Sequence, residues 1–134
     1  MAKFTKEMLE MFKTNGPVAF ATASKKGVPN VALIGVVWPN DDGTISFIDN
    51  FMNKTCTNLL ENPQAAFYLW NKDCKESYQV KGTIAICGEG PEYEAAVAKA
   101  HAINEGFPAK HLLKFTPTDI YYMTPGPNAG KKVQ

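Results

Sequence analysis

Short runs of apolar and β-branched residues, separated by polar turn residues, recur along most of this chain. The runs cover residues 17–24, 28–38, 44–49, 64–70, 77–87 and 118–124. The segments between most of them are rich in Gly, Asn, Asp and Lys, a composition that is typical of turns between strands. The pattern therefore predicts six β-strands.

Three other stretches have the signals of helices. Thr5 is an N-cap for the first helix, and Gly16 ends it. The second helix is expected over residues 54–61, and the third lies within residues 90–106 with Pro91 in its first turn.

The short turns between strands decide the sheet topology. Parallel neighbours need long crossover connections, and most of the predicted turns are too short for them. The sequence also contains no internal repeat or low-complexity tract. We therefore expect a mainly β, closed or nearly closed antiparallel barrel, with helices at its outside or ends.

Composition indicates one ordinary domain. The chain has 134 residues, of which 45% are hydrophobic and 20% are charged, so residues 1–134 form one domain with a substantial core. The net charge of +1 gives no general attraction for nucleic acid or an anionic membrane. The apolar runs are too short to span a bilayer and the N-terminus lacks a secretory pattern, so we expect a cytoplasmic protein without a membrane partner.

The cysteines and histidines show no ligand spacing. Cys56, Cys74 and Cys87 are an odd number without a CxxC motif, and His101 and His111 stand ten residues apart. Neither arrangement indicates a disulfide framework or a metal site. We therefore expect reduced, structural cysteines and no metal.

The start of the second helix carries an unexpected cation. Lys54 lies where the helix dipole is positive and where Asp or Glu is preferred, which indicates that an anion belongs there. Lys54, the Thr55 hydroxyl, Asn53 and the free backbone amides together could form a phosphate site. The alternative is that Asn53 only caps the helix and Lys54 is solvated. No Gly-rich loop accompanies them, so a nucleoside triphosphate is not indicated.

Several motifs now point to a family. "GVPN", "FMNKTCTNLLENP", "FYLW" and "YQVKGTI", with a looser echo in "TPGPNAGK", resemble the FMN-binding split barrels related to pyridoxamine 5'-phosphate oxidase. The resemblance covers about residues 16–90. The matching positions are Lys54, Thr55, Leu59, Asn62, Pro63 and Trp70.

The resemblance implies both a fold and a cofactor site. The fold would be a six-stranded antiparallel split β-barrel of Greek-key type with a few flanking helices. The FMN phosphate would lie at Lys54 and Thr55, with Asn53 beside them.

The same resemblance implies which strands hold the flavin ring. Residues of the second strand, Ile34, Gly35 and Val36, would lie along the isoalloxazine, and Ile48 and Asp49 would flank it.

One family feature is missing from the fifth strand. The Arg-Gln pair that reaches the flavin from the partner subunit in the oxidases would fall on Glu76 and Ser77. Gln79, two positions on and so on the same face of the strand, is either its substitute or a solvated residue.

The resemblance also implies a homodimer with two flavin sites at the subunit interface. The number of large aromatic residues agrees with this expectation, because aromatic side chains are enriched at interfaces. The residues concerned are Trp38, Trp70, Phe51, Tyr121 and Tyr122. They could instead pack on helices of their own barrel.

Three functions are open at this point. The first is a small FMN-dependent oxidoreductase of unknown substrate, with a nicotinamide donor that diffuses in and out. The second is a non-enzymatic FMN-binding carrier that passes electrons to a partner protein. The third, a barrel that binds single-stranded nucleic acid, is disfavoured by the neutral charge balance.

The chain contains no arginine, and all 14 basic residues are lysines. Bidentate clamping of a substrate phosphate by arginine is therefore excluded, which argues against true pyridoxamine phosphate oxidase activity. No nucleophile motif such as GxSxG is present either. The sequence leaves open whether a haem or a deazaflavin replaces FMN, and whether the Gly- and Pro-rich tail is a frayed end or an arm.

Overall fold

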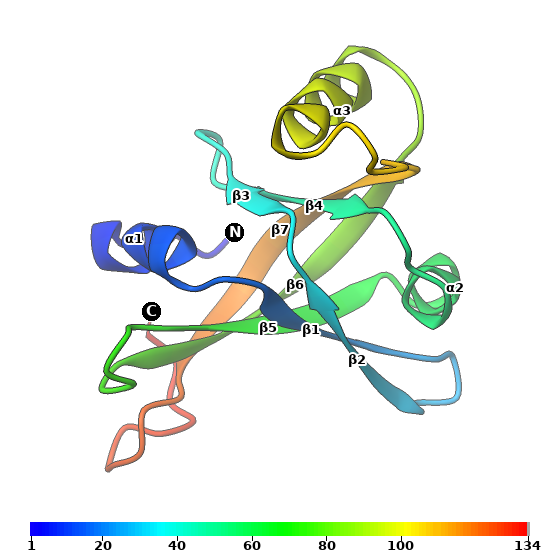
Figure 1. Ribbon diagram of the computed structural model, residues 1–134. Helices are drawn as coiled ribbons and strands as arrows, with labels where there is room; N and C mark the ends of the chain where they lie inside the picture. Colours follow the sequence, from blue (N-terminus) through cyan, green and yellow to red (C-terminus); the bar gives the residue numbers. More distant parts are fainter. Residues whose placement is uncertain (134) are drawn as a thin grey trace.

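The computed structural model describes residues 1–133, which form one curled antiparallel sheet with three helices (Figure 1). The elements in chain order are α1 (Lys6–Thr14), β1 (Val18–Ala23), β2 (Pro29–Ile34), β3 (Val37–Pro39), β4 (Ile45–Asp49), α2 (Lys54–Glu61), β5 (Gln64–Trp70), β6 (Ser77–Cys87), α3 (Pro91–Ile103) and β7 (His111–Tyr122). Among the residues described, each helix is too short or too polar to traverse a lipid bilayer.

The sheet curls because two consecutive strands lie at its opposite edges. The strand order is β2-β1-β5-β6-β7-β4-β3, and every pairing is antiparallel. Only Gly35 and Val36 separate β2 from β3, so the chain passes directly from one edge to the other. The Ile48 amide donates to the Val36 carbonyl at 3.1 Å and holds this crossing in place. The result is a split barrel.

The mainly β, antiparallel split-barrel prediction is confirmed, but the count of six strands is wrong. The sheet has seven strands, because the predicted strand over 28–38 divides at Gly35 into β2 and β3. An apolar run shows where a strand can form, but it does not show where the chain leaves one edge for another.

The predicted start of the last strand is also wrong. β7 begins at His111 rather than at residue 118, and its first half pairs with β4 as well as with β6. Pro117 is unfavourable inside a strand, since proline cannot donate to a ladder. In the fold, Pro117 lies opposite Gly82, where the register shifts and the strand tolerates it.

Four phenylalanines form the centre of the main core. Phe20, Phe47, Phe67 and Phe115 are all buried and come from four different strands. Their ring centroids lie 4.7 Å apart for Phe20 and Phe47, 5.4 Å for Phe47 and Phe67, and 5.1 Å for Phe67 and Phe115. Such tilted and edge-to-face contacts add to the apolar area that these rings bury.

A smaller apolar cluster joins α3 to β4 and β7. Ala96 and Ala100 are buried on one face of the helix, against Ile48 and Leu112. Small side chains let the helix lie close to the strands. Ile48 therefore packs in this cluster and also borders the cleft described below.

The C-terminal segment returns along β7, as far as the structure describes it. Tyr122 donates its amide to Lys131 at 2.9 Å, and Val133 donates to Ile120 at 2.9 Å. The Gly- and Pro-rich stretch between them forms the turn. The described part of this tail is therefore neither frayed nor an arm ordered on another molecule, because it pairs with β7 of its own chain.

We expect Gly82→Ala to lower the free energy of unfolding by at least about 2 kcal/mol, because an added methyl group has no room. A Cβ at Gly82 would overlap the Thr116 carbonyl oxygen and lie 2.6 Å from the Phe115 ring. Urea denaturation followed by circular dichroism measures the change.

Gly16→Ala is the matched control, because nothing lies within 4 Å of the corresponding position. Its stability should stay within about 0.5 kcal/mol of the parent chain. Equal destabilisation by both substitutions would contradict the steric explanation.

Candidate functional site

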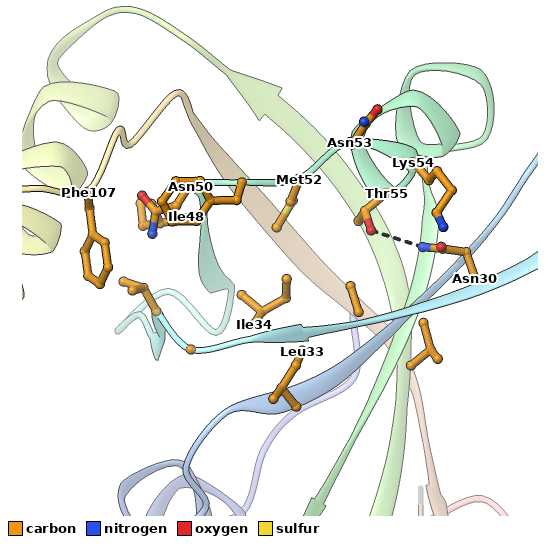
Figure 2. Close-up of a pocket in the computed structure, with 15 residues that line it drawn as sticks. Asn30, Leu33, Ile34, Ile48, Asn50, Met52, Asn53, Lys54, Thr55 and Phe107 are labelled. Atoms are coloured by element: carbon orange, nitrogen blue, oxygen red, sulfur yellow. Dashed lines mark hydrogen bonds between the residues drawn. The ribbon is translucent and has the colours of Figure 1, made fainter.

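A cleft opens beside the edge strand β2 and under the start of α2 (Figure 2). Its volume is about 430 Å³. The lining consists of residues 30–36, Ile48, residues 50–55 and Phe107. The walls therefore come from β2, from the end of β4 and from the loop that leads into α2.

One end of the cleft is polar. Lys54 and Thr55 are the first two residues of α2, and Asn53 occupies the N-cap position without a side-chain capping bond. The first turn of α2 contains no acidic residue. The N–H groups of this helix start therefore receive no side-chain acceptor from Asn53, and Lys54 beside them is exposed.

Asn30 fixes the Thr55 hydroxyl in this polar end. Its amide nitrogen donates to Thr55 Oγ1 at 3.0 Å, a bond drawn in Figure 2, and lies 3.2 Å from Thr22 Oγ1. Because Thr55 Oγ1 accepts this bond, its own proton can be donated elsewhere. The hydroxyl is therefore oriented as a donor for an anion.

A buried amide anchors α2 to the sheet. Asn58, one turn further along the helix, is buried, and its amide nitrogen donates to Thr22 Oγ1 at 3.1 Å. The side-chain amides of Asn30 and Asn58 thus both donate to the Thr22 hydroxyl of β1. This arrangement fixes the start of α2 relative to β1 and β2.

The other end of the cleft is apolar. Ile34, Val36 and Ile48 are buried, and Met52 and Phe107 are half-buried. Figure 2 shows the side chains of Ile34 and Met52 directed toward each other across the space. Such walls suit a flat, apolar ring.

Hydrogen bonds between side-chain oxygens and backbone amides hold the loop before α2. Asp49 is almost fully buried, and its Oδ1 accepts from the Met52 amide at 3.0 Å. Asn50 Oδ1 accepts from the Ala109 amide at 3.0 Å. Asp49 does not line the cleft and instead fixes the loop that does.

The structure brings most of the sequence-predicted site residues together. Ile34, Gly35, Val36, Ile48, Asn53, Lys54 and Thr55 all line the cleft. Three others lie outside it, namely Asp49, Ser77 and Gln79. Their roles in binding stay predictions.

Ser77 and Gln79 lie on β6, away from the cleft of their own chain. The Ser77 amide donates to Thr124 Oγ1 at 2.9 Å, which ties β6 to the C-terminal arm. Gln79 pairs with Tyr121 across the ladder and borders a separate shallow hollow. Neither residue contributes to the cleft within one chain.

Sequence reasoning missed several lining residues. Asn30 had a usable signal, since a polar residue inside an apolar strand needs a partner. Asn50 and Met52 lie in the loop whose course only the fold reveals. Phe107 follows α3 in the chain and reaches the cleft from far away in sequence, so no local pattern indicated it.

Comparison with known proteins identifies relatives over nearly the whole chain. The family model described as pyridoxamine 5'-phosphate oxidase matches residues 4–124. An uncharacterised protein of Methanocaldococcus jannaschii is 39% identical over 136 aligned residues, which cover 99% of this chain and 89% of that protein.

Two solved structures have the same fold. HupZ of Group A Streptococcus superposes with a TM-score of 0.80 at 26% identity, covering 95% of this chain and 99% of its own. An FMN-binding protein from Syntrophomonas wolfei superposes with a TM-score of 0.74 at 23% identity, covering 89% of this chain and 88% of its own. At that identity the second match is evidence for the fold alone.

We expect Asn58→Ala to lower the free energy of unfolding by about 1–2 kcal/mol, because a buried hydrogen bond to Thr22 is lost. Thr57→Ala, an exposed position on the same helix, is the control and should change stability by less than about 0.5 kcal/mol. Thermal unfolding of both variants measures the difference, and an unchanged Asn58→Ala protein would show that the anchor contributes nothing.

Proposed function

This chain belongs to the pyridoxamine 5'-phosphate oxidase family, and we propose that it is an FMN-binding flavoprotein, a small oxidoreductase whose flavin lies in the cleft beside β2. The observation that carries the proposal is the two-part character of this cleft. A cation, an oriented hydroxyl and free amides form one end, and buried aliphatic side chains form the other.

The polar end fits a phosphate monoester. The Lys54 ammonium supplies a point charge, Thr55 donates from its hydroxyl, and the first amides of α2 lie along the positive end of the helix dipole. Charge-assisted hydrogen bonds of this kind are stronger than neutral ones. Discrimination of FMN from riboflavin would rest here.

The apolar end fits the flavin ring. Ile34, Val36 and Ile48 exclude water from one region of the cleft, while Gly35 presents backbone without a side chain. A ligand ring could therefore approach the backbone of residues 34–36 closely.

Bound FMN would supply hydride and electron transfer, and the protein would contribute binding and orientation. None of the described residues that line the cleft is His, Cys, Asp or Glu, so they offer no general acid or base apart from Lys54, which the FMN phosphate would engage. A reduction of a modest organic substrate, with a nicotinamide donor, needs no such group from the protein.

True oxidation of pyridoxamine phosphate is not part of the proposal. A second phosphate would need its own clamp, and the sequence contains no arginine to form a bidentate one. Lys54 is the lysine that lines the cleft, and the FMN phosphate would use it.

A second candidate is an FMN-binding electron carrier without a substrate. The lack of acid and base groups other than Lys54 among the described lining residues favours it equally. Reoxidation of the reduced protein that depends on a small molecule would indicate an enzyme. Reoxidation only by a partner protein would indicate a carrier.

The proposed functional unit is a homodimer. Val31 and Leu33 on β2 are 69% and 73% exposed, and Phe51 in the loop between β4 and α2 is 79% exposed. Leu33 points to the opposite side of β2 from Ile34 (Figure 2). Large apolar side chains clustered on an edge strand are typical of an interface, and the family resemblance implies flavin sites there.

We expect Lys54→Ala to weaken FMN affinity by about 1.5–3 kcal/mol, because a charge-assisted hydrogen bond to the phosphate is lost. Riboflavin affinity should stay nearly unchanged, since riboflavin has no phosphate. Quenching of flavin fluorescence on titration into flavin-free protein measures both affinities.

Lys26→Ala, in the exposed turn between β1 and β2, is the matched control and should bind both flavins normally. Equal loss of both flavins in Lys54→Ala, or no loss of FMN, would rule out a phosphate site at this helix. The absorption spectrum of the purified protein separates flavin from haem and deazaflavin at the outset.

We expect Leu33→Asp to convert the dimer to a monomer, because a carboxylate would lose its water in an apolar interface. Ile103→Asp, at an exposed apolar position on α3, is the control and should remain dimeric. Sedimentation velocity measures the mass. A parent chain that is already monomeric would refute the dimer.

A further inference from the structure

Three side chains with metal-ligating atoms converge from three elements. Asp49 ends β4, Cys56 lies in the first turn of α2, and His111 begins β7. One ligand atom from each lies within 4.8 Å of the others. Asp49 and His111 are direct partners in the β4–β7 ladder, and His111 Nδ1 lies 2.9 Å from Asp49 Oδ2.

This cluster is distinct from the cleft. None of the three residues lines the cleft, although Lys54 and Thr55 immediately precede Cys56. Residues 50–53, which line the cleft, follow Asp49 directly in the chain.

We propose that Asp49, Cys56 and His111 form a binding site for a divalent transition-metal ion of the Zn²⁺ class. One nitrogen, one oxygen and one sulfur donor suit Zn²⁺ or Co²⁺, whereas Mg²⁺ and Ca²⁺ prefer oxygen ligands alone. Three protein ligands leave a fourth tetrahedral position for water or another small ligand.

The distances are close to those of a tetrahedral site. Ligand atoms around Zn²⁺ lie roughly 3.3–3.8 Å apart, given metal–ligand bonds of about 2.0–2.3 Å. The Asp49–His111 separation of 2.9 Å needs to open slightly, and the thiol, which lies within 4.8 Å of both partners, needs to approach by about 1.5 Å at most. Cys56 and His111 are partly exposed, so an ion can enter from solvent.

A buried carboxylate supplies the negative charge of the cluster. This carboxylate belongs to Asp49, which is 1% exposed. A divalent ion would stabilise the buried carboxylate and a thiolate together. Lys110 lies 3.8 Å from Asp49 Oδ1, on the oxygen that His111 does not contact.

The competing interpretation is a hydrogen-bonded Asp–His pair with an uninvolved thiol beside it. In the metal site Asp49 would bind the ion, in addition to accepting a hydrogen bond from the Met52 amide through Oδ1. Ion binding would therefore link β4, α2 and β7 next to the loop that borders the cleft.

The experiment is a titration of the purified full-length chain, stripped with a chelator, with Co²⁺ and then with Zn²⁺. Difference spectra remove any bound chromophore. The site predicts uptake of one Co²⁺ per chain with a near-ultraviolet thiolate-to-cobalt band, which Zn²⁺ abolishes. The readout does not depend on flavin, so its failure and that of the FMN proposal are distinguishable.

Variants assign the ligands. Cys56→Ser should abolish the thiolate band and weaken Zn²⁺ binding at least about tenfold, and His111→Ala should weaken it similarly. Cys87→Ser, also a partly exposed free cysteine, is the matched control and should bind as the parent does. Circular dichroism shows that each variant is folded.

Two results would overturn the proposal. The first is a parent chain that takes up no Co²⁺ or Zn²⁺ saturably. The second is a thiolate band that persists in folded Cys56→Ser.

Discussion

The crossing at Gly35 and Val36 is the constraint on which the rest of the structure depends. Two residues carry the chain from one edge of the sheet to the other, so the sheet must curl around its phenylalanine core. The curl leaves β2 as an edge next to the end of β4 and the start of α2. The cleft forms at this split, because the backbone there pairs on one side only.

The segment from Asp49 to Cys56 serves two features at once. Lys54 and Thr55 face the cleft, while Asp49 and Cys56 at its ends meet His111. Hydrogen bonds accepted by Asp49 and Asn50 fix the backbone of this short loop. Its side chains can therefore point to two different features.

Family membership by itself leaves the chemistry open, because a fold supports many activities. The described residues that line the cleft offer the Lys54 cation for a phosphate but no further acid or base. A flavin would bring its own reactivity, and the protein would then act through shape, polarity and the exclusion of water. The absence of arginine narrows the range of possible substrates further, since lysine does not hold a substrate phosphate in a bidentate clamp.

The sequence alone determined the local features of this protein. It predicted the helix Lys54–Glu61 with the same bounds as the structure, the antiparallel class, and the placement of a lysine and a hydroxyl at one helix start. These follow from spacing and turn chemistry, which are properties of neighbours in the chain. Tertiary structure decided the division of residues 28–38 at Gly35 and the early start of β7, because both depend on which strand pairs with which. It also decided that Asp49, Cys56 and His111 meet, since strand pairing brings together side chains 62 residues apart that no local spacing relates.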